Sequence, residues 1–170
     1  MSAKKFYTVP FVWDKSVWVL TSLIFVVWVG FSGWKLWEIF TIDDAHNSLV
    51  SLIVFNVVML PTILISEGLA PQRLEVGEKR LVILRRYKSV TIDAEDVASV
   101  EQLPDGLRGA VRTFGVGGLF GYYGFFYKAS IGSFKLYATS MNNLFLIRLV
   151  NGKKVVISCA EPEKMKHFSA

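Results

Sequence analysis

The stretch VWVLTSLIFVVWVGFSGW, residues 17–34, decides the architecture because it holds eighteen consecutive residues without a charged side chain. Continued to Phe40, it is long enough to cross the roughly 30 Å hydrocarbon core of a bilayer as a tilted helix. Tryptophans, whose rings prefer the headgroup level, lie near both ends of this stretch: Trp13, Trp18, Trp34 and Trp37. We therefore predict a first transmembrane helix over about residues 16–40.

A second uncharged run, SLVSLIVFNVVMLPTILIS, occupies residues 48–66 and predicts a second transmembrane helix. Within it, Pro61 should introduce a kink or end the regular part, because proline removes one backbone hydrogen bond. Asn56, the strongly polar residue at mid-depth, is expected to bond the neighbouring helix and not a transported substrate. Lys35 and Glu38, three residues apart on one helix face, are expected to pair with each other or to reach the interface.

The positions of the cations predict the orientation of this helical hairpin. Lys4, Lys5 and Lys15 precede the first helix, and six Lys or Arg residues follow the second helix by residue 88. The short link between the helices carries Asp43 and Asp44 and no cation. Because cytoplasmic segments are enriched in Lys and Arg, both termini are predicted to face the cytoplasm. The single cysteine, Cys159, fits this reducing compartment.

After residue 68 the pattern changes to short alternating stretches, which are typical of half-buried strands. We predict an α+β protein with a transmembrane hairpin over residues 1–68 and one mostly antiparallel β domain over residues 69–170. The Asn151-Gly152 pair predicts a type I′ turn that joins two antiparallel strands. A helix is expected near Pro162, with Met165 and Phe168 resting on the sheet. The candidate strands are residues 73–76, 80–85, 89–92, 98–103, 134–138, 144–149 and 154–158.

The composition argues against catalysis and against nucleic-acid binding. The net charge of +5 arises entirely after residue 66, yet those cations form no dense cluster. His46 and His167 fall on opposite sides of the membrane in the predicted topology, and Cys159 has no CxxC partner. We therefore expect no catalytic residue, no metal site, no cofactor and no nucleic-acid partner, and the protein is not expected to be an enzyme.

A glycine-rich, aromatic segment over residues 112–127 is the most unusual feature of the predicted β domain. It lacks the GxGxxG and GxxxxGK[ST] patterns of nucleotide loops. In one interpretation its glycines permit an irregular backbone while the aromatic rings pack on the domain. In the other, a loop presents the rings to the bilayer interface and nearby cations meet anionic headgroups. The candidate membrane, lipid or partner surface comprises Lys79, Arg80, Arg85, Arg86, Lys88, Arg112, Phe120, Tyr122, Tyr123, Phe125, Phe126 and Lys128.

The stretch from Arg112 to Phe168 resembles a family of bacterial pleckstrin-homology (PH) domains. The resemblance is carried by Arg-Thr-Phe-Gly at 112–115, Gly-Leu-Phe-Gly-Tyr at 118–122, Leu-Tyr-Ala-Thr at 136–139 and Ile-Ser at 157–158. It implies a seven-stranded antiparallel roll capped by a helix, to which residues 69–111 supply the first strands. It also implies a bacterial cytoplasmic membrane as the location, and it brings no catalytic residues.

Three functions remain open at this point. The first is a binding or scaffold module that mediates protein interaction, assembly or self-association at the cytoplasmic face of the membrane. The second is recognition of anionic lipid headgroups by the PH-like domain. The third, with the least support, is a small accessory subunit of a transporter, because two helices form no pore alone.

Overall fold

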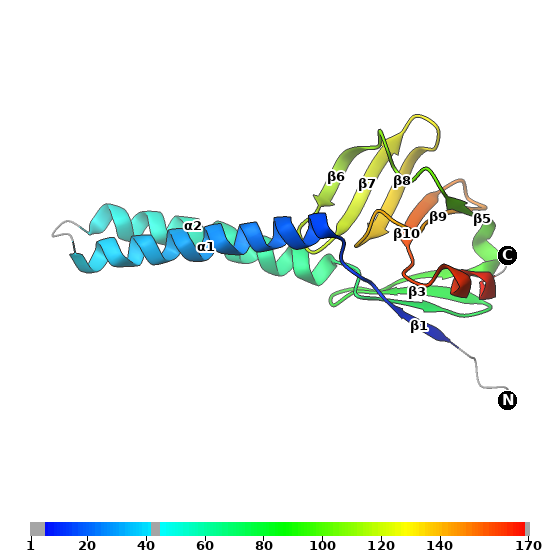
Figure 1. The fold of residues 1–170 in the computed structure, drawn as a ribbon, viewed down its shortest axis with the longest axis horizontal. Helices are drawn as coiled ribbons and strands as arrows, with labels where there is room; N and C mark the ends of the chain where they lie inside the picture. Colours follow the sequence, from blue (N-terminus) through cyan, green and yellow to red (C-terminus); the bar gives the residue numbers. More distant parts are fainter. Residues whose placement is uncertain (1–5, 42–44, 169–170) are drawn as a thin grey trace.

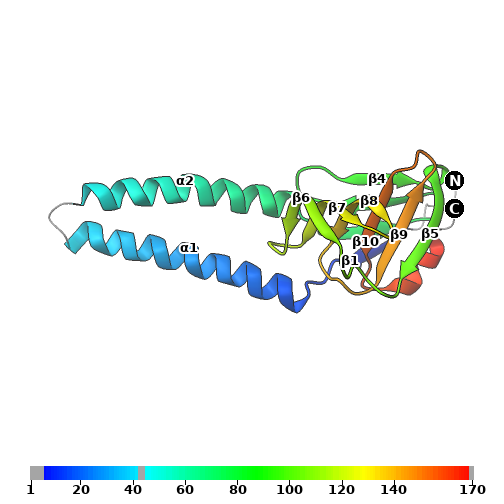
Figure 2. The same ribbon diagram turned by 90° about the horizontal axis from the view of Figure 1, so that it is seen from above.

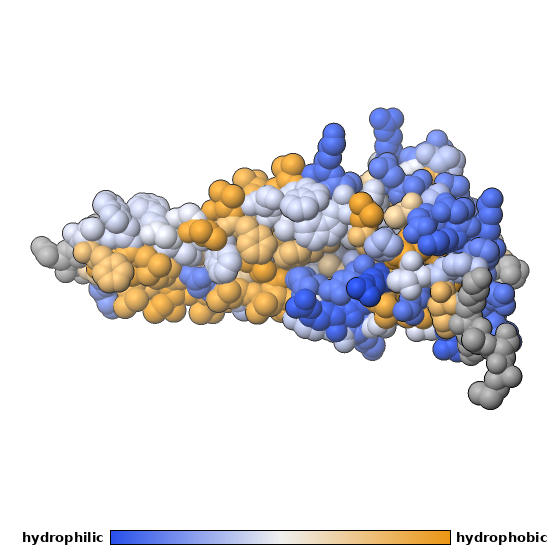
Figure 3. Space-filling view, turned by 60° about the horizontal axis from the view of Figure 1, so that its bottom comes forward, coloured by the Kyte–Doolittle hydropathy of each residue, from blue (hydrophilic) through white to orange (hydrophobic). Residues whose placement is uncertain are grey.

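A long helical arm ends in a β part in the computed structural model, which describes residues 6–41 and 45–168 (Figure 1). The arm consists of α1, Lys15–Thr41, and α2, His46–Leu69, which run side by side in opposite directions (Figure 2). Both helices are long and apolar enough to cross a membrane, and only 11% of the most apolar stretch of each is buried. A core helix of a soluble protein would be mostly buried. The surface of the arm is accordingly rich in hydrophobic residues, whereas hydrophilic ones gather over the β part (Figure 3).

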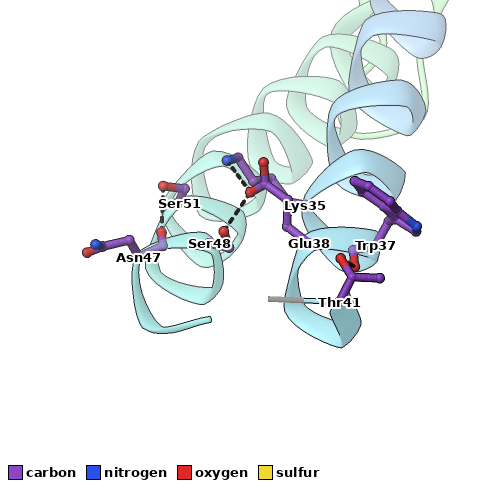
Figure 4. A network of polar contacts seen from close by, with 7 residues as sticks. All are labelled: Lys35, Trp37, Glu38, Thr41, Asn47, Ser48 and Ser51. Atoms are coloured by element: carbon purple, nitrogen blue, oxygen red, sulfur yellow. Dashed lines mark hydrogen bonds and ion pairs between the residues drawn. The ribbon is translucent and has the colours of Figure 1, made fainter. Parts of the chain in front are cut away.

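Polar contacts join the two helices at two levels. The Trp28 indole N–H donates to the side-chain oxygen of Asn56 at 2.9 Å, and the Asn56 amide donates to the Ser32 hydroxyl at 3.3 Å. Near the end of the arm remote from the β part, Lys35 and Glu38 pair at 2.7 Å. The Ser48 hydroxyl of α2 donates to the same Glu38 carboxylate at 2.6 Å (Figure 4). The predicted partners of Asn56 and of Lys35 are thus confirmed.

Two predictions for the helical hairpin concern Pro61 and the charged residues outside the helices. Pro61 lies inside α2, and the helix continues beyond it to Leu69, so the expectation that Pro61 would end the regular part is wrong. Asp43 and Asp44, and likewise Lys4 and Lys5, lie outside the described residues.

Replacing Asn56 by alanine is expected to lower the stability of the arm by about 1 kcal/mol, the scale of an interhelical side-chain hydrogen bond in a membrane protein. The measurement is thermal unfolding of the full chain in detergent micelles. Thr62→Ala is the control, because the Thr62 hydroxyl donates only to the Val58 carbonyl of its own helix. Equal unfolding temperatures for the two variants would contradict the bridging role of Asn56.

The smaller of two sheets is antiparallel throughout and has the strand order β1-β2-β3-β4. Strand β1 comes from the chain before α1, where only a helix was expected, and it pairs with β2 directly after α2. The helical arm is therefore inserted between two hydrogen-bonded strands. Their bounds are β1, Tyr7–Pro10; β2, Arg73–Val76; β3, Arg80–Leu84; and β4, Val90–Asp93.

The larger sheet has the order β5-β9-β10-β8-β7-β6 and is mixed, because β8 and β10 run parallel while its other pairs are antiparallel. The 3-10 helix η1, Ala94–Asp96, leads into it from β4. The described chain thus has ten strands in place of the seven that the resemblance implies, and the α+β class is confirmed. The bounds are β5, Val97–Leu103; β6, Val111–Gly117; β7, Tyr122–Lys128; β8, Gly132–Ala138; β9, Leu144–Leu149; and β10, Lys154–Ser158.

The hairpin between β9 and β10 is confirmed, but its turn differs from the prediction. Gly152 has φ of 79° and its N–H donates to the Leu149 carbonyl at 2.9 Å, whereas Asn151 has no positive φ. A type I′ turn needs positive φ at both central residues, so the loop instead has its single left-handed residue at the glycine. The predicted C-terminal helix is a short 3-10 helix, η2, Pro162–His167, and Met165 and Phe168 are buried against the sheets as expected.

The glycine-rich segment forms the β6–β7 hairpin, which the sequence analysis did not predict as strands. Gly115 and Gly124 face each other across it with φ of 127° and 125°, in the region that favours glycine. A Cβ on Gly124 would overlap the carbonyl oxygen of Phe114, and one on Gly115 would overlap that of Tyr123. The glycines therefore allow two strands to approach at a point where side chains would separate them.

Candidate functional site

The aromatic residues of the β6–β7 hairpin join the β part to the arm. Phe120 is buried edge-to-face against Trp13 and Phe25, and its backbone N–H donates to the Thr21 hydroxyl at 3.1 Å. The Tyr123 hydroxyl donates to the Ser66 carbonyl of α2 at 2.6 Å. Burial raises the pKa of Tyr123 to about 12, so this hydroxyl stays a donor at neutral pH. These two rings form a largely buried junction with the helices, and Tyr123 also borders a cavity of the β part.

Asp14 fastens the start of α1 to the larger sheet. Its carboxylate accepts the Val17 N–H at 2.9 Å, which caps the helix, and the Met141 N–H at 3.2 Å. The Tyr122 hydroxyl donates to it at 3.4 Å. Burial of the ring and the negative charge of Asp14 raise the pKa of Tyr122. The first turn of α1 is thus held by two segments far apart in the sequence.

The cations of the predicted surface do not form one cluster. Arg80 lies at one end of β3, where it pairs with Asp93 at 3.7 Å, and Lys79 precedes it. Arg85, Arg86 and Lys88 follow the other end of β3, beside α2. There the intervening Tyr87 donates its N–H to the Gly68 carbonyl and its hydroxyl to the Leu64 carbonyl, both at 3.1 Å.

The remaining members of the predicted surface are also dispersed. Arg86 is engaged in an ion pair with Glu67 at 2.9 Å. Lys128, at the end of β7, donates to the Gly106 carbonyl at 3.0 Å. Phe126 is buried in the hydrophobic core beside Phe134, whereas Phe125 on the same strand is exposed.

A basic cleft brings several of the predicted residues together. Two cavities of about 630 and 720 Å³ share Arg85, Phe125, Lys135 and Tyr137 in their walls, so they form one continuous groove. It begins at Leu69, the last residue of α2, and passes between the two sheets. Six cations line it, and no aspartate or glutamate does: Arg85, Lys88, Arg112, Lys135, Lys153 and Lys154.

Aromatic rings hold two of these cations in place. The Arg85 guanidinium lies over the Tyr137 ring at 5.4 Å from its centre, and its Nε donates to the Lys88 carbonyl at 2.7 Å. The Lys135 ammonium lies over the Phe125 ring at 5.0 Å. None of the six cations forms an ion pair with a carboxylate in the described part of the chain. Uncompensated positive charge along a groove favours anionic ligands.

Sequence reasoning identified Arg85, Lys88, Arg112, Tyr123 and Phe125, all of which line the cleft, but it missed the lysines on the opposite wall. Lys135 alternates with the buried Phe134 and Leu136 along β8, a pattern that shows only that its side chain points outward. Which outward-facing lysines meet across the gap depends on how the sheets close, and no local signal encodes that.

The described residues offer little for chemistry beyond binding. No group of three or more His, Cys, Asp or Glu residues that could hold a metal ion occurs within residues 6–41 and 45–168. The His167 ring stacks on Tyr7 at 4.4 Å, while His46 begins α2 at the remote end of the arm. Burial raises the pKa of the Cys159 thiol, which therefore stays protonated.

Comparison with known protein families identifies the family to which the β part belongs. The family model described as the bacterial PH domain matches residues 72–169, which is more than half of the chain. No curated protein and no solved structure matches the sequence. The matched region begins just before β2 and includes η2, so it contains every residue that lines the cleft except Leu69. The chain therefore belongs to the bacterial PH domain family.

Proposed function

We propose that this protein is a membrane-anchored PH domain that binds anionic lipid headgroups in its basic cleft. PH-like domains act as binding modules and are generally non-catalytic, and the two apolar helices indicate association with a membrane. The observation that carries the proposal is the set of six cations without a carboxylate, in a groove that begins where α2 ends. Phosphate groups of lipids would complement this charge at the level where the chain leaves the bilayer.

The proposed orientation places the PH domain at the cytoplasmic face of a bacterial inner membrane. It is supported by the excess of Lys and Arg after α2 and by the absence of cations in the link between the helices. The cytoplasmic leaflet carries anionic lipids, and each nearby cation contributes about 1 kcal/mol of attraction. A cysteine introduced at Asp44 tests the orientation. It should react with a membrane-impermeant reagent added from outside the cell, and protection would contradict it.

Reversing two charges of the cleft is expected to abolish its preference for anionic lipid. The variant is Arg85→Glu/Lys135→Glu, which changes two cations shared by both cavities. The full chain in detergent micelles is mixed with phosphatidylglycerol or phosphatidylcholine, and native mass spectrometry counts the lipid retained. The wild-type protein should retain phosphatidylglycerol preferentially, and the variant should bind it at least about thirtyfold less tightly, because the loss of two cations at about 1 kcal/mol each removes about 2 kcal/mol.

The control for this experiment is Lys79→Glu/Arg80→Glu, which reverses the same number of charges at the far end of β3. It should bind phosphatidylglycerol like the wild-type protein. Equal losses in both variants would indicate non-specific attraction by net charge, and no loss in the cleft variant would reject the cleft as the site. The full chain is required, because β1 from before α1 completes the smaller sheet.

Assembly with another protein, the first function expected from the sequence, stays a prediction. The exposed apolar faces of α1 and α2 are available to a partner helix as well as to lipid. Crosslinking in native membranes followed by mass spectrometry should yield a defined partner or a self-associated species. Recovery of random neighbours alone would count against it.

A further inference from the structure

The β part contacts the arm at the ends of its helices and also well inside them. On α1 the contact is at Thr21, whose hydroxyl lies 3.4 Å from the Gly118 carbonyl and accepts the Phe120 N–H. Thr21 is about 9 Å along the helix axis from Lys15, at 1.5 Å per residue. On α2 the Tyr87 hydroxyl reaches Leu64, which lies about 8 Å before the end of the helix at Leu69. The β part therefore overlaps both helices.

The parts of the helices beyond these contacts come close to the thickness of a bilayer core. The Phe120 ring reaches as far as Phe25 on α1, and from Phe25 to Thr41 this helix extends about 24 Å, while from His46 to Leu64, α2 extends about 27 Å. The hydrocarbon core of a typical bilayer is about 30 Å thick. If the core covered α1 from Lys15 onward, the β6–β7 turn would be submerged, and exposed sheet edges do not occur in hydrocarbon. The turn must then lie at the boundary of the core.

Strand β6 is the part of the larger sheet that this placement brings to the membrane. It is one of the two edge strands of this sheet, paired only with β7, and both ribbon views show it nearer the arm than the other strands of the sheet (Figures 1 and 2). Phe114 at its centre is 74% exposed, more than any other aromatic side chain described outside the arm, and Val111 is 62% exposed. A free strand edge with exposed apolar side chains favours aggregation in water.

We propose that β6 lies on the phospholipid interface of the bilayer that holds the arm, with Phe114 and Val111 inserted among the headgroups. We name the bilayer as the partner of this strand because β6 faces along the arm, toward the region where lipids surround α1 and α2. Arg112 on β6 lies close to the apolar side chains and suits the phosphate groups of this layer. Water and phosphate oxygens in the interface can satisfy the backbone donors of the free edge. The contact depends on the arm crossing the membrane, and it adjoins the cleft, because Phe114 and Arg112 also line one of the two cavities.

The test is the depth of a fluorescent label on β6. The variant Phe114→Cys, in the full chain, is labelled with an environment-sensitive fluorophore and reconstituted into vesicles of phosphatidylcholine and phosphatidylglycerol. Val150→Cys is the matched control, because Val150 is 70% exposed on the β9–β10 turn at the far end of the β part. The native Cys159 is 1% exposed, so the unsubstituted protein should take up no label.

We expect the label at position 114 to be quenched by lipids that carry a nitroxide near the headgroup and to be shielded from aqueous iodide. The label at position 150 should show the opposite behaviour. Val111→Cys gives a second position on β6 with the same expected result. Quenching at 114 by iodide but not by nitroxide lipid would overturn the proposal, and so would shielding from both quenchers, which would indicate a protein on this edge.

The same label separates this inference from the proposed function. In the Arg85→Glu/Lys135→Glu background the quenching by nitroxide lipid should persist, because the arm sets the depth of β6. A variant that loses retention of phosphatidylglycerol but keeps this quenching supports both proposals. If the variant without the cleft charges also lost the quenching, the charges and not the arm would bring β6 to the membrane. That result would overturn the inference.

Discussion

Replacement of Gly124 by alanine is expected to lower the unfolding temperature of the β part strongly. The residue has φ of 125°, and an added Cβ would overlap the Phe114 carbonyl oxygen of the neighbouring strand. The obstacle is backbone and not a flexible side chain, so the β6–β7 pair would have to separate. Strain and lost pairing together should cost more than about 3 kcal/mol, a large share of the 5–15 kcal/mol that stabilises a typical domain.

Circular dichroism of the full chain in detergent micelles measures this effect as a loss of the β signal on heating. Gly109→Ala is the matched control, because Gly109 also has positive φ, 76°, but an added Cβ there would meet nothing within 4 Å. Gly109→Ala should lower the free energy of unfolding by only about 1 kcal/mol, the cost of alanine at a backbone position with positive φ. If both alanine variants unfolded at the same temperature, the close approach of β6 and β7 at Gly124 would not be the determining contact.

Replacement of Asp14 by alanine is expected to release the start of α1 from the larger sheet. The substitution removes the cap of α1 and leaves the Met141 N–H without its acceptor. Loss of a helix cap costs about 1 kcal/mol, and an unpaired donor away from water costs about 1–3 kcal/mol. The global stability should therefore fall by about 2–4 kcal/mol, although the fold of both sheets is retained.

Amide hydrogen exchange of the full chain measures this release locally. The amides of Val17 and Met141 should exchange faster in Asp14→Ala, while those in β9 and β10 should keep their protection. Asp105→Ala, at an exposed position in the turn after β5, should leave all of these rates unchanged. Unaltered exchange at Val17 in Asp14→Ala would show that other contacts hold the helix start.

The helical arm and seven of the ten described strands could be predicted from the sequence because their signals are local. A charge-free run long enough to span a bilayer is recognisable without knowing its neighbours. The alternation in residues 73–76, 144–149 and 154–158 likewise matches the observed strands β2, β9 and β10 residue for residue. Asn151-Gly152 predicted the position of the turn between β9 and β10 correctly, but it did not predict the conformation of that turn.

The strands that escaped prediction depend on partners far away in the chain. Strand β1 is four residues long, ends in Pro10 and is stabilised by β2 from beyond both helices, so proline is tolerated at this sheet edge. Strands β6 and β7 contain glycines, which local propensity disfavours in strands. Their pairing works because Gly115 and Gly124 meet each other, a contact that neither residue reveals alone. The lysines on the far wall of the cleft could not be predicted for the same reason, because they meet the other wall only through the way in which the two sheets close.

The pairing of β1 with β2 across the arm has a mechanical consequence. Backbone hydrogen bonds fasten the two ends of the arm together at the β part, Asn56 joins the helices at mid-length, and Glu38 with Ser48 joins them near the other end. The two helices are therefore expected to tilt as one rod and not to slide past each other. Because a helix pair adjusts its tilt to the thickness of the surrounding bilayer, the angle at which the cleft meets the membrane becomes a function of lipid chain length.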